Sequence, residues 1–205
     1  MKSVVAVLPD IGELKDFIVD SEDGKYDDTL HQAAWRGDYN ELEDMLSKNN
    51  IYLDFPLRPF GATPLRLAAM NYKAQCVELL LKHGAAVDIP DRKGQTPLFC
   101  AVKNCDTDCC VLLLRSGACP DGDRRNLSTP LYLACQNRYP IGVKVCTLLL
   151  DYGAQIEWPH VPPAWLHPLH VAATYGHLDC FILLLLGGAD IRRAGNVLHI
   201  ICSRK

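Results

Sequence analysis

Residues 63–84 have the sequence TPLRLAAMNYKAQCVELLLKHG, and this stretch decides the fold because its features recur along the chain. The tripeptide Thr-Pro-Leu at its start returns at residues 96–98 and 129–131, at a spacing of 33 residues each time. A leucine triplet and a Gly-Ala pair follow each tripeptide in the same order. Motifs that recur together in a fixed register indicate an internal structural repeat.

Two further units extend the repeat in both directions. One begins with PLHVAA at residues 168–173 and continues to a leucine triplet at 183–185. A weaker unit begins with TLHQAA at residues 29–34 and ends near Leu46. The sequence therefore predicts about five units, and residues 196–202 read as the first helix of a sixth.

Each motif has a structural role in a pair of antiparallel helices. Thr63 and its equivalents can cap the first helix by accepting hydrogen bonds from free backbone N–H groups, and proline suits the first turn. The alanine pair lets the helices approach closely, and the leucine triplet covers the inner face of the second helix. The glycine after the triplet accepts the left-handed turn that ends this helix. No unit can bury its apolar face alone, so the units must stack.

Three places depart from the repeat. The fourth unit has three extra residues near Pro140, which we place in the turn between its helices because proline breaks a helix interior. Before the fifth unit, the connection at residues 158–165 is longer and contains three prolines, and His167 replaces the capping threonine. Leu127 stands where other units have glycine, which predicts an atypical turn.

The pattern resembles the ankyrin family, whose period is about 33 residues and whose signature is T-P-L-H-x-A. The resemblance covers residues 28–202. It implies an all-α ankyrin-repeat solenoid, in which helix–turn–helix units are joined by β-turn or hairpin loops. We expect one domain at 28–205, with about five repeats and the first helix of a sixth. Residues 1–27 form a leader, in which a short amphipathic helix is predicted at 11–19.

The composition argues against several classes of function. The 205 residues carry a formal net charge of −3, so no global basic field favours nucleic acid or anionic lipid. The longest apolar run, near residues 181–186, is far shorter than the roughly 20 residues that cross a bilayer. The apolar stretch at residues 4–8 is too short for a signal peptide. We therefore expect no membrane or nucleic-acid partner and a cytoplasmic location, with the nucleus as a second compartment.

The ten cysteines raise the alternative of a metal site. Four of them, at positions 105, 109, 110 and 119, could be imagined around a zinc ion. However, Cys109 has the same repeat position as Cys76 and Cys180, three residues before a leucine triplet. We expect this position to face the core, where a thiol packs as a small apolar group. The sequence therefore predicts reduced structural cysteines, no metal and no cofactor.

The histidines do not indicate catalysis. His31, His170 and His199 occupy the histidine position of the ankyrin motif, where the imidazole typically links neighbouring turns by hydrogen bonds. A catalytic site needs a nucleophile or carboxylate in a fixed constellation, and these histidines fall in three separate units. The sequence also lacks a phosphate-binding glycine loop and a hydrolase elbow. We expect that the protein is not an enzyme.

An ankyrin stack is expected to present a concave face, lined by loop tips and by the first helix of each unit. The two positions after the alanine pair form a stripe across this face, and large apolar side chains there suit an interface. The loop tips add aromatic and basic residues. The predicted partner-binding residues are Trp35, Arg36, Phe60, Met70, Asn71, Arg92, Lys93, Lys103, Asn104, Arg124, Arg125, Gln136, Asn137, Trp165, Thr174 and Tyr175. For Trp165, packing under its own proline-rich loop is the alternative.

A closer resemblance concerns residues 61–69, GATPLRLAA, and 175–186, YGHLDCFILLLL. Together with Arg66 in place of the usual histidine and the acidic leader, they look like the ankyrin-repeat and SOCS-box family. Such proteins are substrate receptors of cullin-RING ubiquitin ligases. Their ankyrin stack holds the target, and a C-terminal SOCS box recruits elongin B, elongin C and cullin 5.

The resemblance implies that this stack recognises a protein substrate on its concave face. The chain ends within the predicted sixth unit, so we expect a form truncated before the SOCS box. Elongin B/C and cullin 5 are expected partners only of a longer form that carries this box. A stand-alone ankyrin scaffold or inhibitor, unrelated to ubiquitination, is the alternative.

Overall fold

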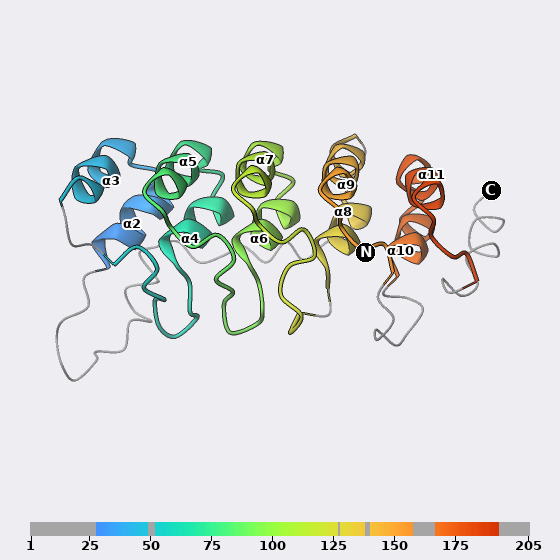
Figure 1. The fold of residues 1–205 in the computed structure, drawn as a ribbon, viewed down its shortest axis with the longest axis horizontal. Helices are drawn as coiled ribbons and strands as arrows, with labels where there is room; N and C mark the ends of the chain where they lie inside the picture. The colour runs from blue at the N-terminus through green and yellow to red at the C-terminus, as the bar shows by residue number, and fades with distance from the viewer. Residues whose placement is uncertain (1–27, 49–51, 127, 138–139, 158–166, 193–205) are drawn as a thin grey trace.

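The computed structural model describes residues 28–48, 52–126, 128–137, 140–157 and 167–192, which form a row of helix pairs (Figure 1). The first helices of the pairs are α2 (Thr29–Arg36), α4 (Pro64–Met70), α6 (Pro97–Lys103), α8 (Pro130–Gln136) and α10 (Pro168–Tyr175). The second helices are α3 (Tyr39–Leu46), α5 (Ala74–Lys82), α7 (Thr107–Arg115), α9 (Ile141–Asp151) and α11 (Leu178–Leu186). Each pair corresponds to one of the five units predicted from the sequence.

The helices lie in two layers (Figure 1). The first helices form one layer, the second helices form the other, and the loops between successive pairs extend on the side of the first helices. Within the described ranges, the only β-type pairing is an isolated bridge between Leu57 and Ala62 in one of these loops. We call the surface formed by the first helices and the loops the inner face, and the surface of the second helices the outer face.

Threonine caps three of the first helices, as predicted. The Oγ1 atoms of Thr63, Thr96 and Thr129 accept hydrogen bonds from the backbone N–H three residues later, at 3.1 to 3.3 Å. A proline follows each threonine in the first turn. In α10 the cap position holds His167, whose side chain makes no capping hydrogen bond.

The core runs along the whole row of pairs. Its largest members occupy the same positions in successive units, and all are fully buried: Leu65, Leu98 and Leu131 in the first helices, and Leu80, Leu113, Leu149 and Leu184 in the second helices. Cys76, Cys109 and Cys180 are also buried, which confirms that their shared position faces the core. Each pair buries its apolar side against its neighbours, which is how a solenoid gains stability.

Pro140 immediately precedes α9, so its predicted place between the two helices of the fourth unit is confirmed. The next turn contains Gly142, which is buried against the end of α8. A Cβ atom at Gly142 would lie 2.5 Å from the carbonyl oxygen of Asn137 and 2.8 Å from that of Ala134. The absence of a side chain at Gly142 therefore allows α9 to pack this closely on α8.

Carboxylates connect successive loops in a ladder. Each carboxylate accepts a hydrogen bond from a backbone N–H about one repeat further along the chain, at 2.7 to 2.9 Å. The pairs are Asp54 with Ala86, Asp88 with Cys119, Asp121 with Gln155, and Glu157 with Asp190. The ladder holds the loops in register and thereby fixes the spacing of the loop tips on the inner face.

The ladder carboxylate Asp88 should make the stability of the stack depend on pH. Burial raises the pKa of Asp88, although the bond from the Cys119 N–H opposes this, and its buried Oδ1 has no hydrogen-bond partner among the described residues. Because the folded-state pKa is raised, this group's contribution to stability is full below the usual Asp pKa of about 4 and is lost as the pH rises through the raised value.

We therefore expect Asp88→Asn, which cannot ionise, to be more stable relative to wild type at pH 7 than at pH 3.5. Thermal unfolding of both proteins at the two pH values checks this, with Asp151→Asn on the exposed end of α9 as the control. A difference in stability that is the same at both pH values would contradict the expectation.

Several sequence-based predictions fall outside the described residues. They are the helix at 11–19, the atypical turn at Leu127, the proline-rich connection at 158–165 and the sixth unit. No helix in the described part of the chain is long and apolar enough to cross a membrane.

Candidate functional site

The predicted stripe lies along the inner face, at the C-terminal ends of the first helices. Each first helix ends on one of the two positions that follow the alanine pair. The regular spacing of the helices places these pairs in neighbouring units side by side. The two members of each pair nevertheless have different roles.

The second member of three pairs is part of the scaffold. The Nδ2 atoms of Asn71, Asn104 and Asn137 donate hydrogen bonds to backbone carbonyl oxygens near the end of the preceding first helix. The acceptors are the carbonyls of Trp35, Met70 and Val102. The acceptors lie in the last turn of their helices, where intrahelical donors run out, although the Val102 carbonyl also accepts from the backbone N–H of Cys105. The structure therefore gives these asparagines a role in joining units, which the sequence-based prediction of a binding stripe did not include.

The first members of the first three pairs, which are Trp35, Met70 and Lys103, line a cleft of about 240 Å³ on the inner face. The cleft lies among α2, α4, α6 and the loops that precede α4 and α6. Six predicted residues meet in it: Trp35, Phe60, Met70, Lys93, Lys103 and Asn104. Trp35 and Met70 are partly buried in the cleft, whereas Phe60 is 47% exposed.

Arg66 also lines the cleft, and its charge is neutralised within the protein. Its side chain is buried, and Nη2 donates to Oδ2 of Asp91 at 2.7 Å. The guanidinium also donates to the backbone and side-chain oxygens of Gln95, at 3.0 and 3.1 Å. Asp91 in turn accepts from the backbone N–H groups of Lys93 and Gln95, both at 2.8 Å. Arg66 therefore fixes the loop beside the cleft and is not available to attract a ligand.

In the first unit a histidine occupies the position equivalent to Arg66. The Nε2 atom of His31 lies 2.7 Å from the carbonyl oxygen of Phe55 in the following loop. This confirms the predicted structural role of the motif histidine in that unit. At the equivalent position in the second unit, the longer and charged side chain of Arg66 forms a buried network.

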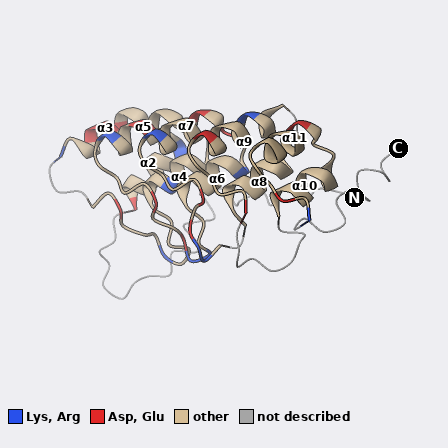
Figure 2. Cartoon of the chain, turned by 45° about the vertical axis from the view of Figure 1, so that its right-hand side comes forward, with Lys and Arg blue, Asp and Glu red and all other residues tan. Residues whose placement is uncertain are grey.

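Basic residues gather at the loop tips (Figure 2), and two lysines line the cleft. Four exposed residues, Arg92, Lys93, Lys103 and Arg124, form no salt bridge with any described residue. Arg125 differs, because its guanidinium bonds both carboxylate oxygens of Asp123, at 2.9 and 3.0 Å. These bonds hold the pKa of Asp123 below its usual value.

Comparison with protein families gives a match over most of this stack. Residues 30–126, 88–160 and 121–195 each match the family described as ankyrin repeats (3 copies). The chain belongs to the ankyrin-repeat family. The predicted all-α ankyrin-repeat fold is thereby confirmed, and the row of pairs is an ankyrin stack that acts as a protein-interaction module.

Individual relatives show which ankyrin-repeat proteins this chain is similar to. Over 172 residues the chain is 52% identical to mouse Ankyrin repeat and SOCS box protein 12, covering 78% of this chain and 54% of the relative. The human protein of that name is 50% identical, again covering 78% of this chain and 54% of the relative. The chain thus spans about half the length of these relatives. The crystal structure of the human ASB11 ankyrin repeat domain superposes with a TM-score of 0.68 and 25% identity, covering 84% of this chain and 81% of that one.

The other described residues of the predicted binding set are not among those that line the cleft. At the α10 end, the Nε2 atom of Gln136 donates to the Tyr175 hydroxyl at 2.7 Å, and Tyr175 is 47% exposed. Thr174 directs its hydroxyl to the His170 carbonyl at 2.8 Å. At the other end, Arg36 forms an exposed ion pair with Glu41. Trp165 lies outside the described residues.

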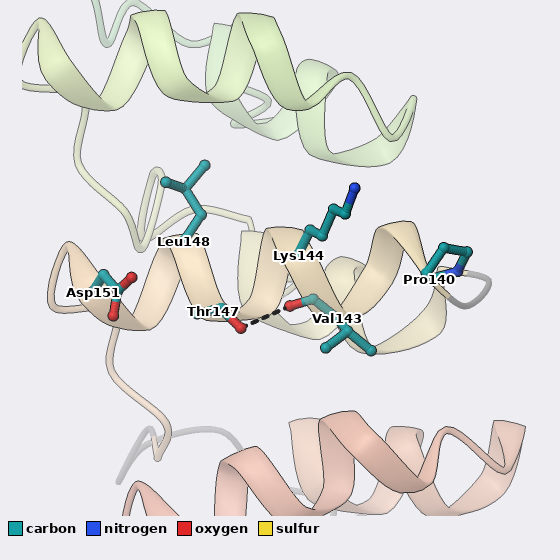
Figure 3. Close-up of a pocket in the computed structure, with 6 residues that line it drawn as sticks. All are labelled: Pro140, Val143, Lys144, Thr147, Leu148 and Asp151. Atoms are coloured by element: carbon teal, nitrogen blue, oxygen red, sulfur yellow. Dashed lines mark hydrogen bonds between the residues drawn. The ribbon is translucent and has the colours of Figure 1, made fainter.

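A second hollow, of about 420 Å³, lies on the outer face of the ankyrin stack along α9 (Figure 3). Pro140, Val143, Lys144, Thr147, Leu148 and Asp151 line it. It is open, and the Thr147 hydroxyl is bonded to the Val143 carbonyl at 3.0 Å. The sequence did not indicate this hollow, although Pro140, near which the fourth unit departs from the repeat, lines it.

The four cysteines considered as zinc ligands differ in their burial. Cys109 and Cys110 are fully buried, whereas Cys119 is exposed, and the described residues contain no group of three metal-binding side chains. Burial raises the pKa of the Cys109 and Cys110 thiols. A raised pKa opposes formation of the thiolate that a metal would need.

Sequence reasoning missed the cleft as a unit because part of its wall is buried. Leu57, Ala62, Leu67 and Cys100 line it beneath the exposed residues. Leu67 and Cys100 occupy the same repeat position, 33 residues apart, so the register contained a signal for them. Leu57 and Ala62 belong to a loop whose path depends on the bridge between them.

Proposed function

We propose that this chain is the substrate-binding part of a cullin-RING ubiquitin ligase receptor, with the inner-face cleft as the point that anchors the target. The single observation that carries the binding part of this proposal is the convergence of Trp35, Phe60 and Met70 on one cleft. Aromatic and methionine side chains around a hollow are the typical centre of a protein interface.

The size of the cleft favours a protein partner over a free small molecule. Small-molecule sites usually have volumes of roughly 300–1,000 Å³. A cleft of about 240 Å³ is smaller than this range and suits a side chain that projects from a larger partner. The surrounding inner face then provides additional area that excludes water from the anchor.

The ligase part of the proposal rests on similarity to Ankyrin repeat and SOCS box protein 12. In a form that carries a SOCS box, elongin B, elongin C and cullin 5 would be recruited through that box. The target on the ankyrin stack would thereby be brought to the ubiquitin-transfer machinery. We propose the cytoplasm as the place of action, with the nucleus as a second compartment.

Affinity purification of the complete gene product tests both parts. We expect the wild type to retain its target together with elongin C and cullin 5. Phe60→Ala should retain elongin C and cullin 5, but the amount of target that it retains should fall at least about tenfold, because the substitution removes a half-exposed anchor. The matched control is Tyr152→Ala, which removes an exposed aromatic side chain at the end of α9. This variant should retain the target, elongin C and cullin 5 as the wild type does.

The remaining outcomes separate the alternatives. A retained target without elongin C or cullin 5 would contradict the ligase role and support a stand-alone ankyrin scaffold. Undiminished target binding by Phe60→Ala would contradict the role of the cleft.

A further inference from the structure

The cleft combines an apolar wall with a cationic rim. Trp35, Phe60, Leu67 and Met70 supply apolar surface, and Cys100 of α6 also lines the cleft. Lys93 and Lys103 also line it, and both are exposed. Because Asp91 neutralises the Arg66 guanidinium, the charges that the cleft offers to a partner are those of the two lysines.

The positive character continues beyond the cleft. Arg92 lies next to Lys93 in the same loop, and Arg124 lies at the tip of the next loop. Neither forms a salt bridge with a described residue, and both are exposed. The whole chain has a net charge of −3, so this surface has the opposite sign to the protein as a whole. Local charge of this kind selects partners of complementary charge and speeds their encounter.

We propose that the cleft recognises an acidic segment of a partner protein, in which one large apolar side chain is flanked by aspartate or glutamate residues. The apolar side chain enters between Phe60, Trp35 and Met70. The flanking carboxylates bind Lys93 and Lys103, and carboxylates further along the segment reach Arg92 and Arg124. This inference rests on the proposed function in that it takes the stack to hold a protein target, and it adds the chemistry by which the target is chosen.

An acidic peptide explains the site better than a nucleic acid does. Both carry negative charge, and bases can stack on aromatic side chains. However, nucleic-acid sites track the phosphate backbone with a groove of basic residues. Here the cationic residues border a mainly apolar cleft, which matches an anchor with flanking charges.

Selection from a random peptide display library on the purified full chain tests the proposal. We expect the enriched peptides to share one aromatic or large aliphatic residue with aspartate or glutamate on at least one side. A labelled peptide from this set then gives the dissociation constant by fluorescence anisotropy. Enrichment of basic or uncharged peptides would overturn the proposal, as would displacement of the peptide by single-stranded DNA at a comparable or lower concentration.

Charge-reversal variants locate the binding site. The double variant Lys93→Glu and Lys103→Glu should weaken binding of the selected peptide at least about tenfold, and higher salt should weaken the wild-type complex. Lys144→Glu, the same change on the outer face, is the matched control and should alter affinity less than about twofold. Phe60→Ala should weaken binding, and Phe60→Leu should restore part of it. Equal effects of the inner-face and outer-face charge reversals would overturn the proposal.

These outcomes also distinguish failure of the chemistry from failure of the proposed function. If selected peptides bind but respond only to changes near Tyr175, the cleft inference fails while the stack remains a protein-binding module. If the complete gene product retains no protein target at all, the proposed function fails as well.

Discussion

Arg66→Met is expected to lower the free energy of unfolding by about 3–5 kcal/mol, because it leaves a buried carboxylate without its cation. The side chains of Arg66 and Asp91 are only 5% and 7% exposed. Methionine retains most of the apolar stem but removes the three hydrogen bonds of the guanidinium. Asp91 retains its two backbone N–H bonds, but these alone do not replace the lost charge partner.

The matched control is Arg36→Met, which breaks an ion pair on the surface. The side chains of Arg36 and Glu41 are 52% and 39% exposed, so water replaces the lost partner. Exposed pairs typically contribute about 0–1 kcal/mol. Urea unfolding followed by circular dichroism gives both values. If the two variants lost equal stability, Arg66 would not be the centre of a buried network.

Gly142→Ala is expected to destabilise the stack by about 1–3 kcal/mol, the usual cost of forcing extra atoms into a packed site. Within a helix, alanine should gain about 1 kcal/mol over glycine from intrinsic propensity. At Gly142 the new Cβ would lie 2.5 and 2.8 Å from two backbone oxygens, which cannot move aside as a flexible side chain could. We expect the steric cost to exceed the propensity gain and to push α9 away from α8.

Lys144→Ala, two residues further along α9 and exposed, is the control for this substitution. It tests the effect of alanine in the same helix without the close contact, and we expect a change within about 0.5 kcal/mol. Thermal unfolding of the two variants gives the comparison. An increase in stability for Gly142→Ala would show that α9 has room to adjust.

The repeat register predicted the fold from the sequence because every unit solves the same packing problem. The caps at Thr63, Thr96 and Thr129 and the buried cysteines before the leucine triplets are local consequences of that register. Pro140 was also placed correctly, since proline limits where the helix can begin. Gly142 was not identified, because its close contact with α8 arises only when the two helices pack.

The site was predicted less completely, because exposure depends on how neighbouring loops fold over the helices. The register placed Trp35 and Met70 on the inner face, but not as partly buried members of one cleft. It also could not show that Asn71 and its equivalents use their amides to bond the preceding unit. The bonds from Arg66 to Asp91 and Gln95 join residues about 25 to 30 positions apart, which helical periodicity does not relate.

Methyl NMR on the full chain labelled with ¹³C-methyl methionine tests the central claim most directly. The sequence has three methionines, of which Met70 lines the cleft and Met45 lies on α3. When a selected acidic peptide is added, we predict that the Met70 methyl resonance shifts in proportion to the bound fraction while the Met45 resonance stays unchanged. A saturated complex in which Met70 does not shift would contradict the assignment of the cleft as the binding site.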